Sequence, residues 1–270
     1  MQTMSASEIW LTSASYFKLP ITPIKAINSI FGYMPTVAHW GWNGNARRYW
    51  DFNYAAKITQ TERQLHHYGS GLNSLPVLNY YEQHPADLYA LRVGFGGNMA
   101  PLTNIHQDGF ASAAFHSFPE LLKWDPYSGD YGPGFLGLSL GQCVYILSDT
   151  KYGDMAFGGN LLSVSGASTI SVEPRDAVKR RVFIADLGLK IEISAGIISG
   201  VEFDRSASTV TLLLASAATT GELQAKSTIV WLKRPTSAFL GYGVSGANQV
   251  RGGWSAKFSG GKATVKITKI

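Results

Sequence analysis

The sequence predicts an α+β protein: a partial (α/α) helical toroid over residues 1–150, followed by an antiparallel β-sandwich over residues 151–270. The hydrophobic pattern changes near residue 151 from the 3.6-residue period of helices to the two-residue period of strands. All six histidines precede residue 117, and 24 of the 33 aromatic residues precede residue 151. We therefore expect the chemistry of the protein in its first half.

Short helices joined by Gly-rich loops are predicted for the first half. Pro76 is expected in the first turn of its helix, where a missing N–H is tolerated, and Gly94 is expected to end the next helix. Several of these segments are apolar on more than one side, which is typical of the inner helices of a toroid. The expected helices are 5–17, 23–31, 45–58, 75–81, 86–93, 115–122 and 135–147.

The second half alternates apolar and polar residues in short, β-branched segments. Gly, Ser and Asp turns separate these segments, and such spacing favours an antiparallel sandwich. The expected strands are 169–172, 181–185, 189–193, 198–203, 209–214, 227–232 and 263–267.

Composition and charge exclude several classes of function. Residues 1–150 carry 8 Lys/Arg and 10 Asp/Glu, whereas residues 151–270 carry 15 and 8. The basic residues form no long cluster, so no nucleic-acid partner is expected, and weak attraction to acidic glycans fits better. The longest weakly polar run, 135–148, is shorter than the ~20 residues that cross a bilayer, so no membrane partner is expected.

Cysteine content and the start of the chain narrow the remaining classes. The single cysteine, Cys143, allows neither an intrachain disulfide nor a cysteine metal cluster, and neither a cofactor nor a metal is expected. The first ten residues lack the features of a secretory signal, which leaves the localisation of this chain open.

The densest group of candidate binding residues lies between 39 and 51. Aromatic rings cover the apolar faces of a sugar ring, while amides, guanidinium groups and carboxylates bind its hydroxyls. The alternative is a buried aromatic cluster in which Asp51 binds Arg47 or Arg48. The candidates are Trp40, Trp42, Asn43, Arg47, Trp50 and Asp51.

A second group lies between 62 and 73, in front of an expected Gly-rich turn. Neighbouring histidines on a helix point to different sides, so a shared metal is not favoured. The alternative is a capping or loop-packing role. The candidates are Glu62, His66, His67, Tyr68 and Asn73.

Two further segments, 104–110 and 124–133, place carboxylates among aromatic residues and glycines on loops, where binding residues concentrate. Each carboxylate has a structural alternative, a turn for Asp125 and a cap or loop contact for the others. The four groups are expected to line one concave face. The candidates are His106, Asp108, Trp124, Asp125, Tyr127, Asp130 and Tyr131.

Five segments resemble the blocks of the DUF5695 family: 62–73, 91–97, 104–117, 124–133 and 156–160. That family is uncharacterised and is similar to six-hairpin glycosidases, so the resemblance implies an (α/α)6 toroid and a carbohydrate substrate. Family members are several times longer. The resemblance therefore implies that this chain is a C-terminal fragment of a parent for which an extracellular location is expected.

Three functions remain open. A glycoside hydrolase needs two carboxylates flanking the scissile bond, for which Asp108 and Asp130 are the first candidates and Glu62 the next. A polysaccharide lyase needs a Tyr or His base and a group that neutralises a uronate, which His66, His67, Tyr68, Asn73 and Arg92 supply. The third is a non-catalytic glycan-binding fragment. In each case the expected partner is an oligosaccharide or polysaccharide.

Overall fold

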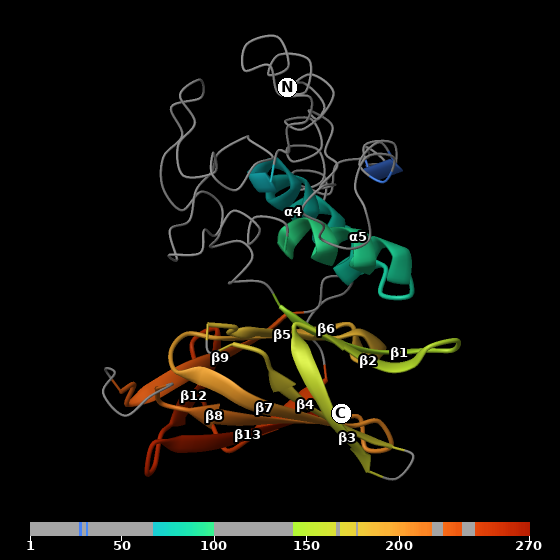
Figure 1. Ribbon diagram of the computed structural model, residues 1–270. Helices are drawn as coiled ribbons and strands as arrows, with labels where there is room; N and C mark the ends of the chain where they lie inside the picture. Colours follow the sequence, from blue (N-terminus) through green and yellow to red (C-terminus); the bar gives the residue numbers. More distant parts are fainter. Residues whose placement is uncertain are drawn as a thin grey trace, which may run out of the picture. The chain divides into compact units, whose positions relative to one another are not determined.

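The computed structural model describes residues 27–28, 31, 67–99, 143–165, 168–176, 178–217, 224–233 and 241–270. The chain divides into two compact units, residues 1–139 and 140–270. Each unit is described by itself. The described part of the first contains a helical hairpin, and the second is a β-sandwich (Figure 1).

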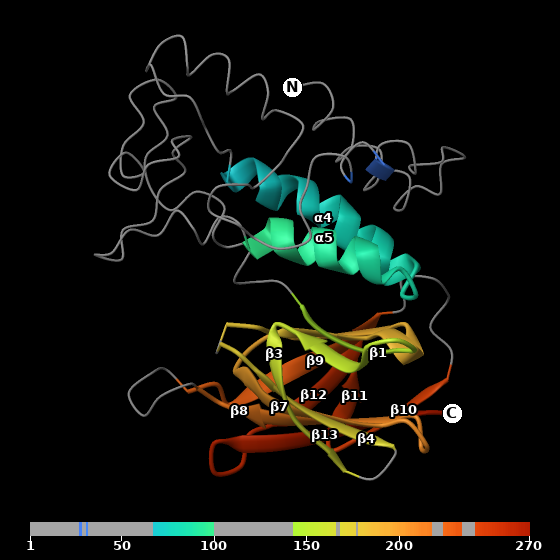
Figure 2. The ribbon, with the colours of Figure 1, turned by 45° about the vertical axis from the view of Figure 1, so that its right-hand side comes forward.

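The helical hairpin consists of α4 (His67–Gln83) and α5 (Leu88–Met99), which run alongside each other (Figure 2). Asp87 starts α5 as an N-cap: its Oδ1 accepts a hydrogen bond from the backbone N–H of Ala90 at 3.0 Å. Ile27, Asn28 and Phe31 are also helical, which agrees with the helix expected at 23–31.

Close contact between α4 and α5 depends on Gly94. A Cβ at this position would lie 2.9 Å from Cγ and Cδ2 of Leu78 and 3.1 Å from Cγ1 of Val77. A side chain would therefore force the two helices apart. The expectation that Gly94 ends its helix is wrong, because the glycine serves helix packing and α5 continues to Met99.

The start of α4 also differs from the prediction. Gly69 and Gly71, expected in a turn, are helical, and Pro76 lies inside the helix. An interior proline removes one intrahelical hydrogen bond. The burial of Val77, Leu78 and Tyr81 on the following turns offsets that loss, so tertiary packing overrides local propensity.

The predicted partial (α/α) toroid is wrong. In the ranges given above, helical structure consists of α4, α5, the residues near Ile27 and one short 3₁₀ turn, whereas strands form two large sheets. Apolar residues on several sides of a helix show only that the helix is buried. A single helical hairpin is enough to produce this pattern, so the pattern does not require a toroid.

The expected helix at 135–147 is also wrong where the structure describes it, because Val144–Asp149 is a strand. Val144, Tyr145, Ile146 and Leu147 are all buried. A strand buried on both faces has no two-residue alternation, so an apolar run of this kind resembles a helix segment.

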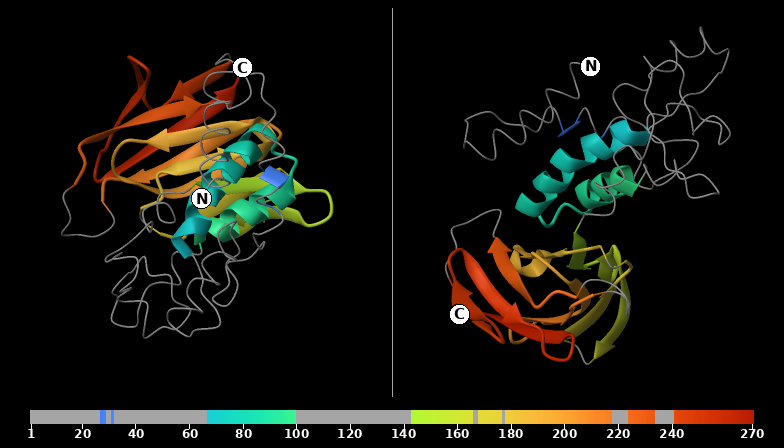
Figure 3. Two further views of the ribbon diagram at one scale, coloured as in Figure 1. Left: turned by 90° about the horizontal axis from the view of Figure 1, so that it is seen from above. Right: turned by 90° about the vertical axis from the view of Figure 1, so that its left-hand side faces the viewer.

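The sandwich consists of a seven-stranded sheet in the order β11-β12-β9-β6-β5-β1-β2 and a six-stranded sheet in the order β10-β13-β8-β7-β4-β3. Figures 1 and 3 show them as two layers, with β5, β6 and β9 in one and β7, β8 and β13 in the other. The strands are β1 (Val144–Asp149), β2 (Gly153–Phe157), β3 (Gly159–Ser165), β4 (Thr169–Pro174), β5 (Arg181–Ile184), β6 (Leu189–Ile193), β7 (Ile197–Asp204), β8 (Thr209–Ala215), β9 (Ser227–Lys233), β10 (Tyr242–Ser245), β11 (Asn248–Val250), β12 (Gly253–Lys257) and β13 (Lys262–Lys269), with the 3₁₀ turn η3 (Ala185–Leu187) after β5.

The sandwich part of the prediction is confirmed, with one change. All seven expected strands are present as β4 to β9 and β13, within one or two residues of the expected bounds. Their pairings are antiparallel, but β1 pairs parallel to β5 through Val144↔Val182 and Ile146↔Ile184. The sandwich is therefore mixed at this one pair of strands.

The core lies between the two sheets and is built from alternate residues of both. Val182, Ile191 and Leu232 form one inward row, because Val182 pairs with Ile191 and Ile191 pairs with Leu232. Leu212 and Phe203 contribute from the other sheet. Each such side chain contributes ~1.5–3 kcal/mol when it is fully buried. Residues between these positions lie on the outer faces of the sheets.

No helix among the described residues has the length and apolar character that crossing a membrane requires.

Candidate functional site

The predicted cleft residues fall mainly outside the described ranges, so their convergence on one face stays a prediction. His67, Tyr68 and Asn73 lie in α4, so the block that contains them is helical from His67 onward. The residues outside the described ranges are Glu62, Asp108 and Asp130, proposed for catalysis, and Trp40, Trp42, Asn43, Arg47, Trp50, Asp51, His66, His106, Trp124, Asp125, Tyr127 and Tyr131, proposed for binding.

The family-like block 156–160 forms the corner where the chain passes from the seven-stranded to the six-stranded sheet. Gly158 has a φ of +78°, a left-handed conformation that favours glycine. A Cβ on Gly159 would lie 2.6 Å from Cγ1 of Val172. Backbone conformation and steric space therefore explain both glycines of this block, without a ligand.

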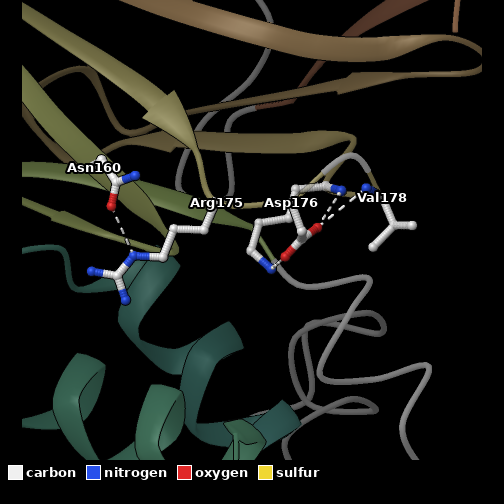
Figure 4. A network of polar contacts seen from close by, with 5 residues as sticks. Asn160, Arg175, Asp176 and Val178 are labelled. Carbon is white, nitrogen blue, oxygen red and sulfur yellow. Dashed lines mark hydrogen bonds and ion pairs between the residues drawn. The ribbon is translucent and has the colours of Figure 1, made fainter. Parts of the chain in front are cut away.

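Polar contacts hold this corner to the loop after β4 (Figure 4). Asn160 Oδ1 accepts a hydrogen bond from Arg175 Nε at 3.1 Å. Asp176 Oδ1 accepts hydrogen bonds from the backbone N–H groups of Val178 and Lys179, and its Oδ2 lies 2.6 Å from Lys179 Nζ. The ammonium group of the buried Lys179 is thus neutralised within its own loop, which indicates a structural role for this network.

A different group of side chains lies on the outer face of the seven-stranded sheet. We call Arg181, Lys190, Glu192, Trp231 and Lys233 the charged face. Strand pairing brings them together on β5, β6 and β9, because Arg181 pairs with Glu192, Glu192 with Trp231, and Lys190 with Lys233. Their sequence neighbours, such as Ile191 and Val230, point into the core.

Glu192 is the electrostatic centre of the charged face. Its Oε1 accepts a hydrogen bond from Arg181 Nε at 3.1 Å, and its Oε2 accepts one from Lys233 Nζ at 3.2 Å. Burial acts to raise the pKa of Glu192, but the hydrogen bonds and charges of Arg181 and Lys233 outweigh it and lower the pKa below its ordinary value. The carboxylate is therefore ionised at neutral pH and binds a cation at each oxygen.

Trp231 gives the charged face an aromatic ring. It is partly exposed, and it lies beside Gly253 on the neighbouring strand β12. A Cβ on Gly253 would lie 3.0 Å from Cδ1 of Trp231, so the indole occupies space that a side chain on β12 would otherwise fill. The next tryptophan, Trp254, packs against the core. Of these two neighbouring indoles, Trp231 is the one on the outer face.

The same outer face continues into an apolar part. Tyr145 pairs with Phe183 on one side and Phe157 on the other, and the rings of Tyr145 and Phe183 are 6.0 Å apart in an edge-to-face arrangement. Tyr145 and Phe183 are buried. These two rings are therefore not accessible to a ligand in solution, whereas the side chains of Arg181 and Lys233 on the charged face are 45% and 61% exposed.

A second charged group, which we call the end network, links the two sheets at one end of the sandwich. It consists of Ser148, Asp154, Asp186 and Arg205. Arg205 Nη2 pairs with Asp154 Oδ1, and Arg205 Nε lies 3.6 Å from Asp186 Oδ2. Ser148 Oγ donates a hydrogen bond to Asp154 Oδ1 at 2.8 Å. One guanidinium group therefore serves two carboxylates.

Asp186 has a raised pKa within the end network. Its burial is the largest influence and raises its pKa above the ordinary value, and the nearby charge of Asp154 acts in the same direction. The charge of Arg205 and hydrogen bonds from Ser148 only partly oppose these effects. The arrangement joins the turn after β7 to β1, β2 and η3, and we assign it to stability.

Sequence reasoning missed the charged face, although a signal for it existed. The strand expected at 227–232 alternates, so the inward positions of Val230 and Leu232 place Trp231 on the opposite side. Glu192 lies outward in the strand 189–193 by the same argument. Most aromatic residues lie in the first half of the chain, so the sequence predicted the binding site there.

Within the described part of the chain, no group of three His, Cys, Asp or Glu side chains is placed to hold a metal ion.

Comparison with known proteins gives a family and no individual relative. Neither the curated proteins nor the solved structures contain a match to the chain. The model of a family described as "Family of unknown function (DUF5695)" matches residues 5–266, which includes almost all of the β-sandwich. The chain therefore belongs to the DUF5695 family.

Proposed function

We propose that this protein is carbohydrate-active and that its β-sandwich binds an oligosaccharide or polysaccharide on the charged face. The observation that carries the proposal is the pairing of Trp231 with Glu192, whose carboxylate holds Arg181 and Lys233 in place. An aromatic ring beside fixed polar groups supplies what a sugar needs: a surface for its C–H face and partners for its oxygens.

The dimensions of the charged face suit one or two sugar units. Lys233 is two residues from Trp231 on β9, which corresponds to about 7 Å along a strand. Arg181 is two strands away, through Glu192, which corresponds to about 10 Å across the sheet. A pyranose over the indole would therefore have both cations near its substituents.

Two catalytic alternatives stay predictions. Glycoside hydrolysis would use Asp108, Asp130 and Glu62, and β-elimination would use His66, His67 or Tyr68 as base. Incubation with neutral and uronic-acid glycans separates these functions. Hydrolysis yields reducing ends alone, elimination also yields an absorbing unsaturated product, and binding alone yields neither.

The binding proposal is tested by affinity electrophoresis of the whole chain against a panel of neutral and acidic polysaccharides. We expect retardation in at least one gel, and we expect Trp231→Ala to weaken binding about tenfold or more because the buried aromatic contact is lost. Tyr152→Ala is the matched control, since Tyr152 is 55% exposed in the turn between β1 and β2. Equal binding by wild type and Trp231→Ala, or no retardation in any gel, would contradict the proposal.

A further inference from the structure

We infer that a neutral, ribbon-like polysaccharide crosses the sandwich on a flat row of residues that runs from Trp231 over Gly253 to Val250. This inference rests on the proposed function and names the substrate class of the same site. Three observations carry it: the way the indole lies against Gly253, the order of the outward residues on three neighbouring strands, and the uncharged side chains beside them.

The indole of Trp231 leans over β12 because Gly253 has no side chain. Gly253 lies opposite Trp231, since the next residue of β12, Trp254, pairs with Val230. A Cβ on Gly253 would lie 3.0 Å from Cδ1 of Trp231. Gly253 is also buried although it lies on the outer face of the sheet, which agrees with an indole above it. A ring that covers the neighbouring strand has one face toward solvent, and a ring face is the surface on which a sugar packs.

The row continues onto β11, the last strand of the seven-stranded sheet. Val250 pairs with Gly253 and is 38% exposed. Trp231, Gly253 and Val250 therefore follow one another on β9, β12 and β11, over about 10 Å across the sheet. Gly253 adds no side chain between the two apolar groups, so the row is flat. A flat row longer than one pyranose ring complements an extended chain of sugars rather than a monosaccharide or a wound chain.

The outward positions beside this row are polar and uncharged. Ser255 and Asn248 pair with each other and form the next row on β12 and β11. A hydroxyl and an amide bind sugar hydroxyls without needing a charge on the ligand. Two cations of the same hairpin, Arg251 and Lys257, lie in its turn and at the last position of β12. On this side of Trp231 the surface therefore fits a neutral glycan.

Val250 separates binding from a purely structural role. An aromatic ring that covers a glycine on a neighbouring strand also stabilises a sheet, so the contact between Trp231 and Gly253 has a structural interpretation. An exposed valine on an edge strand contributes little to stability. Bound sugar units beyond the indole would nevertheless contact it. Loss of affinity without loss of stability at Val250 is therefore the signature of a ligand.

The test compares three neutral ligands: cellohexaose, cellobiose and maltohexaose. Binding to the whole chain is measured by titration calorimetry. We expect cellohexaose to bind about tenfold more tightly than cellobiose, because only the longer chain covers the whole row. We expect maltohexaose to bind about tenfold more weakly than cellohexaose, since its α-linkages wind the chain and lift its rings off a flat surface.

Substitutions locate the row. Val250→Ser is expected to weaken cellohexaose binding about three- to fivefold and to leave cellobiose unaffected, because an apolar contact beyond the indole is lost. Val178→Ser is the matched control and should change neither, since Val178 is 50% exposed in the loop after β4. Gly253→Ala displaces the indole and is expected to weaken both ligands about fivefold. Thermal melting verifies that each variant is folded, and Val250→Ser decides the test if Gly253→Ala does not fold.

The possible failures are distinguishable. Equal affinity for cellobiose and cellohexaose, or cellohexaose binding that Val250→Ser leaves unchanged, would overturn the row and leave glycan binding at Trp231 intact. Equal affinity for maltohexaose and cellohexaose would overturn the ribbon-like substrate. Retardation by polysaccharides without binding of any of the three oligosaccharides would overturn the inference alone. If no polysaccharide retards the chain, the inference and the proposed function are both overturned.

Discussion

The charged face and the end network each place carboxylates beside an arginine, yet the pKa of Glu192 is lowered and that of Asp186 is raised. Glu192 has two cations for one carboxylate, with one cation at each oxygen. In the end network, two carboxylates share Arg205. Burial acts to raise both pKa values, and the two cations at Glu192 outweigh it, whereas the single shared Arg205 does not outweigh it at Asp186.

The largest effect is expected from Arg205→Gln. Removal of this guanidinium leaves Asp154 and Asp186 close together without a cation, and both are more than half buried. We expect a loss of about 2–3 kcal/mol in the free energy of unfolding, measured by urea denaturation.

Arg175→Gln is the control for that measurement. Arg175 is exposed and donates one hydrogen bond to Asn160, so its replacement should cost less than about 0.5 kcal/mol. Equal losses in the two variants would show that the end network does not hold the sheets together as we describe.

A smaller effect is expected from Glu192→Gln. The amide keeps the shape of the side chain but leaves Arg181 and Lys233 without their carboxylate, at a cost of about 0.5–1 kcal/mol for a partly exposed pair. The same variant should also weaken glycan binding on the charged face, because Arg181 and Lys233 lose the carboxylate that holds them in place.

The pH dependence of the free energy of unfolding isolates the contribution of the ion pairs of Glu192. Because its folded pKa is lowered, its contribution is present above the ordinary value of 4.5 and is lost as the pH falls through the folded pKa. Wild type should therefore lose more free energy of unfolding than Glu192→Gln when the pH falls below about 4.5. Parallel pH profiles for the two proteins would contradict the pairing.

The sandwich strands were largely predictable, and the helices expected at 75–81 and 86–93 are present with longer bounds, whereas the start of the sandwich was not predictable. Leu189–Ile193 matches its prediction because β-branched residues alternate cleanly between core and surface. β1 was missed because four consecutive buried residues carry no period. β12 was missed because Gly253, Ser255 and Ala256 have little strand propensity, and its pairing with β9 determines its conformation.

The charged face was predictable only in part. Alternation within β9 places Trp231 on the outer side, but its neighbour Glu192 comes from β6, which pairs with β9 across two intervening strands in the sequence. No local pattern encodes that pairing. The glycines of block 156–160 show the opposite case. Their resemblance to a family block is visible in the sequence, but the structure is needed to explain them by the corner at Gly158.

The smallest effect is expected from Asp186→Asn, and its sign tests the comparison most directly. Because burial raises the folded pKa of Asp186, the folded state binds its proton more tightly than the unfolded state does. The contribution of the protonated carboxyl is therefore complete below the ordinary value of 3.8 and is lost as the pH rises through the folded pKa. At neutral pH the ionised Asp186 is a cost that asparagine removes, so we expect the variant to equal wild type or exceed it by less than about 1 kcal/mol. The difference should shrink as the pH approaches 3.8, which urea denaturation at several pH values measures. A clear loss of stability at neutral pH would mean that the ion pair with Arg205 outweighs burial, and the contrast between the two carboxyls would then disappear.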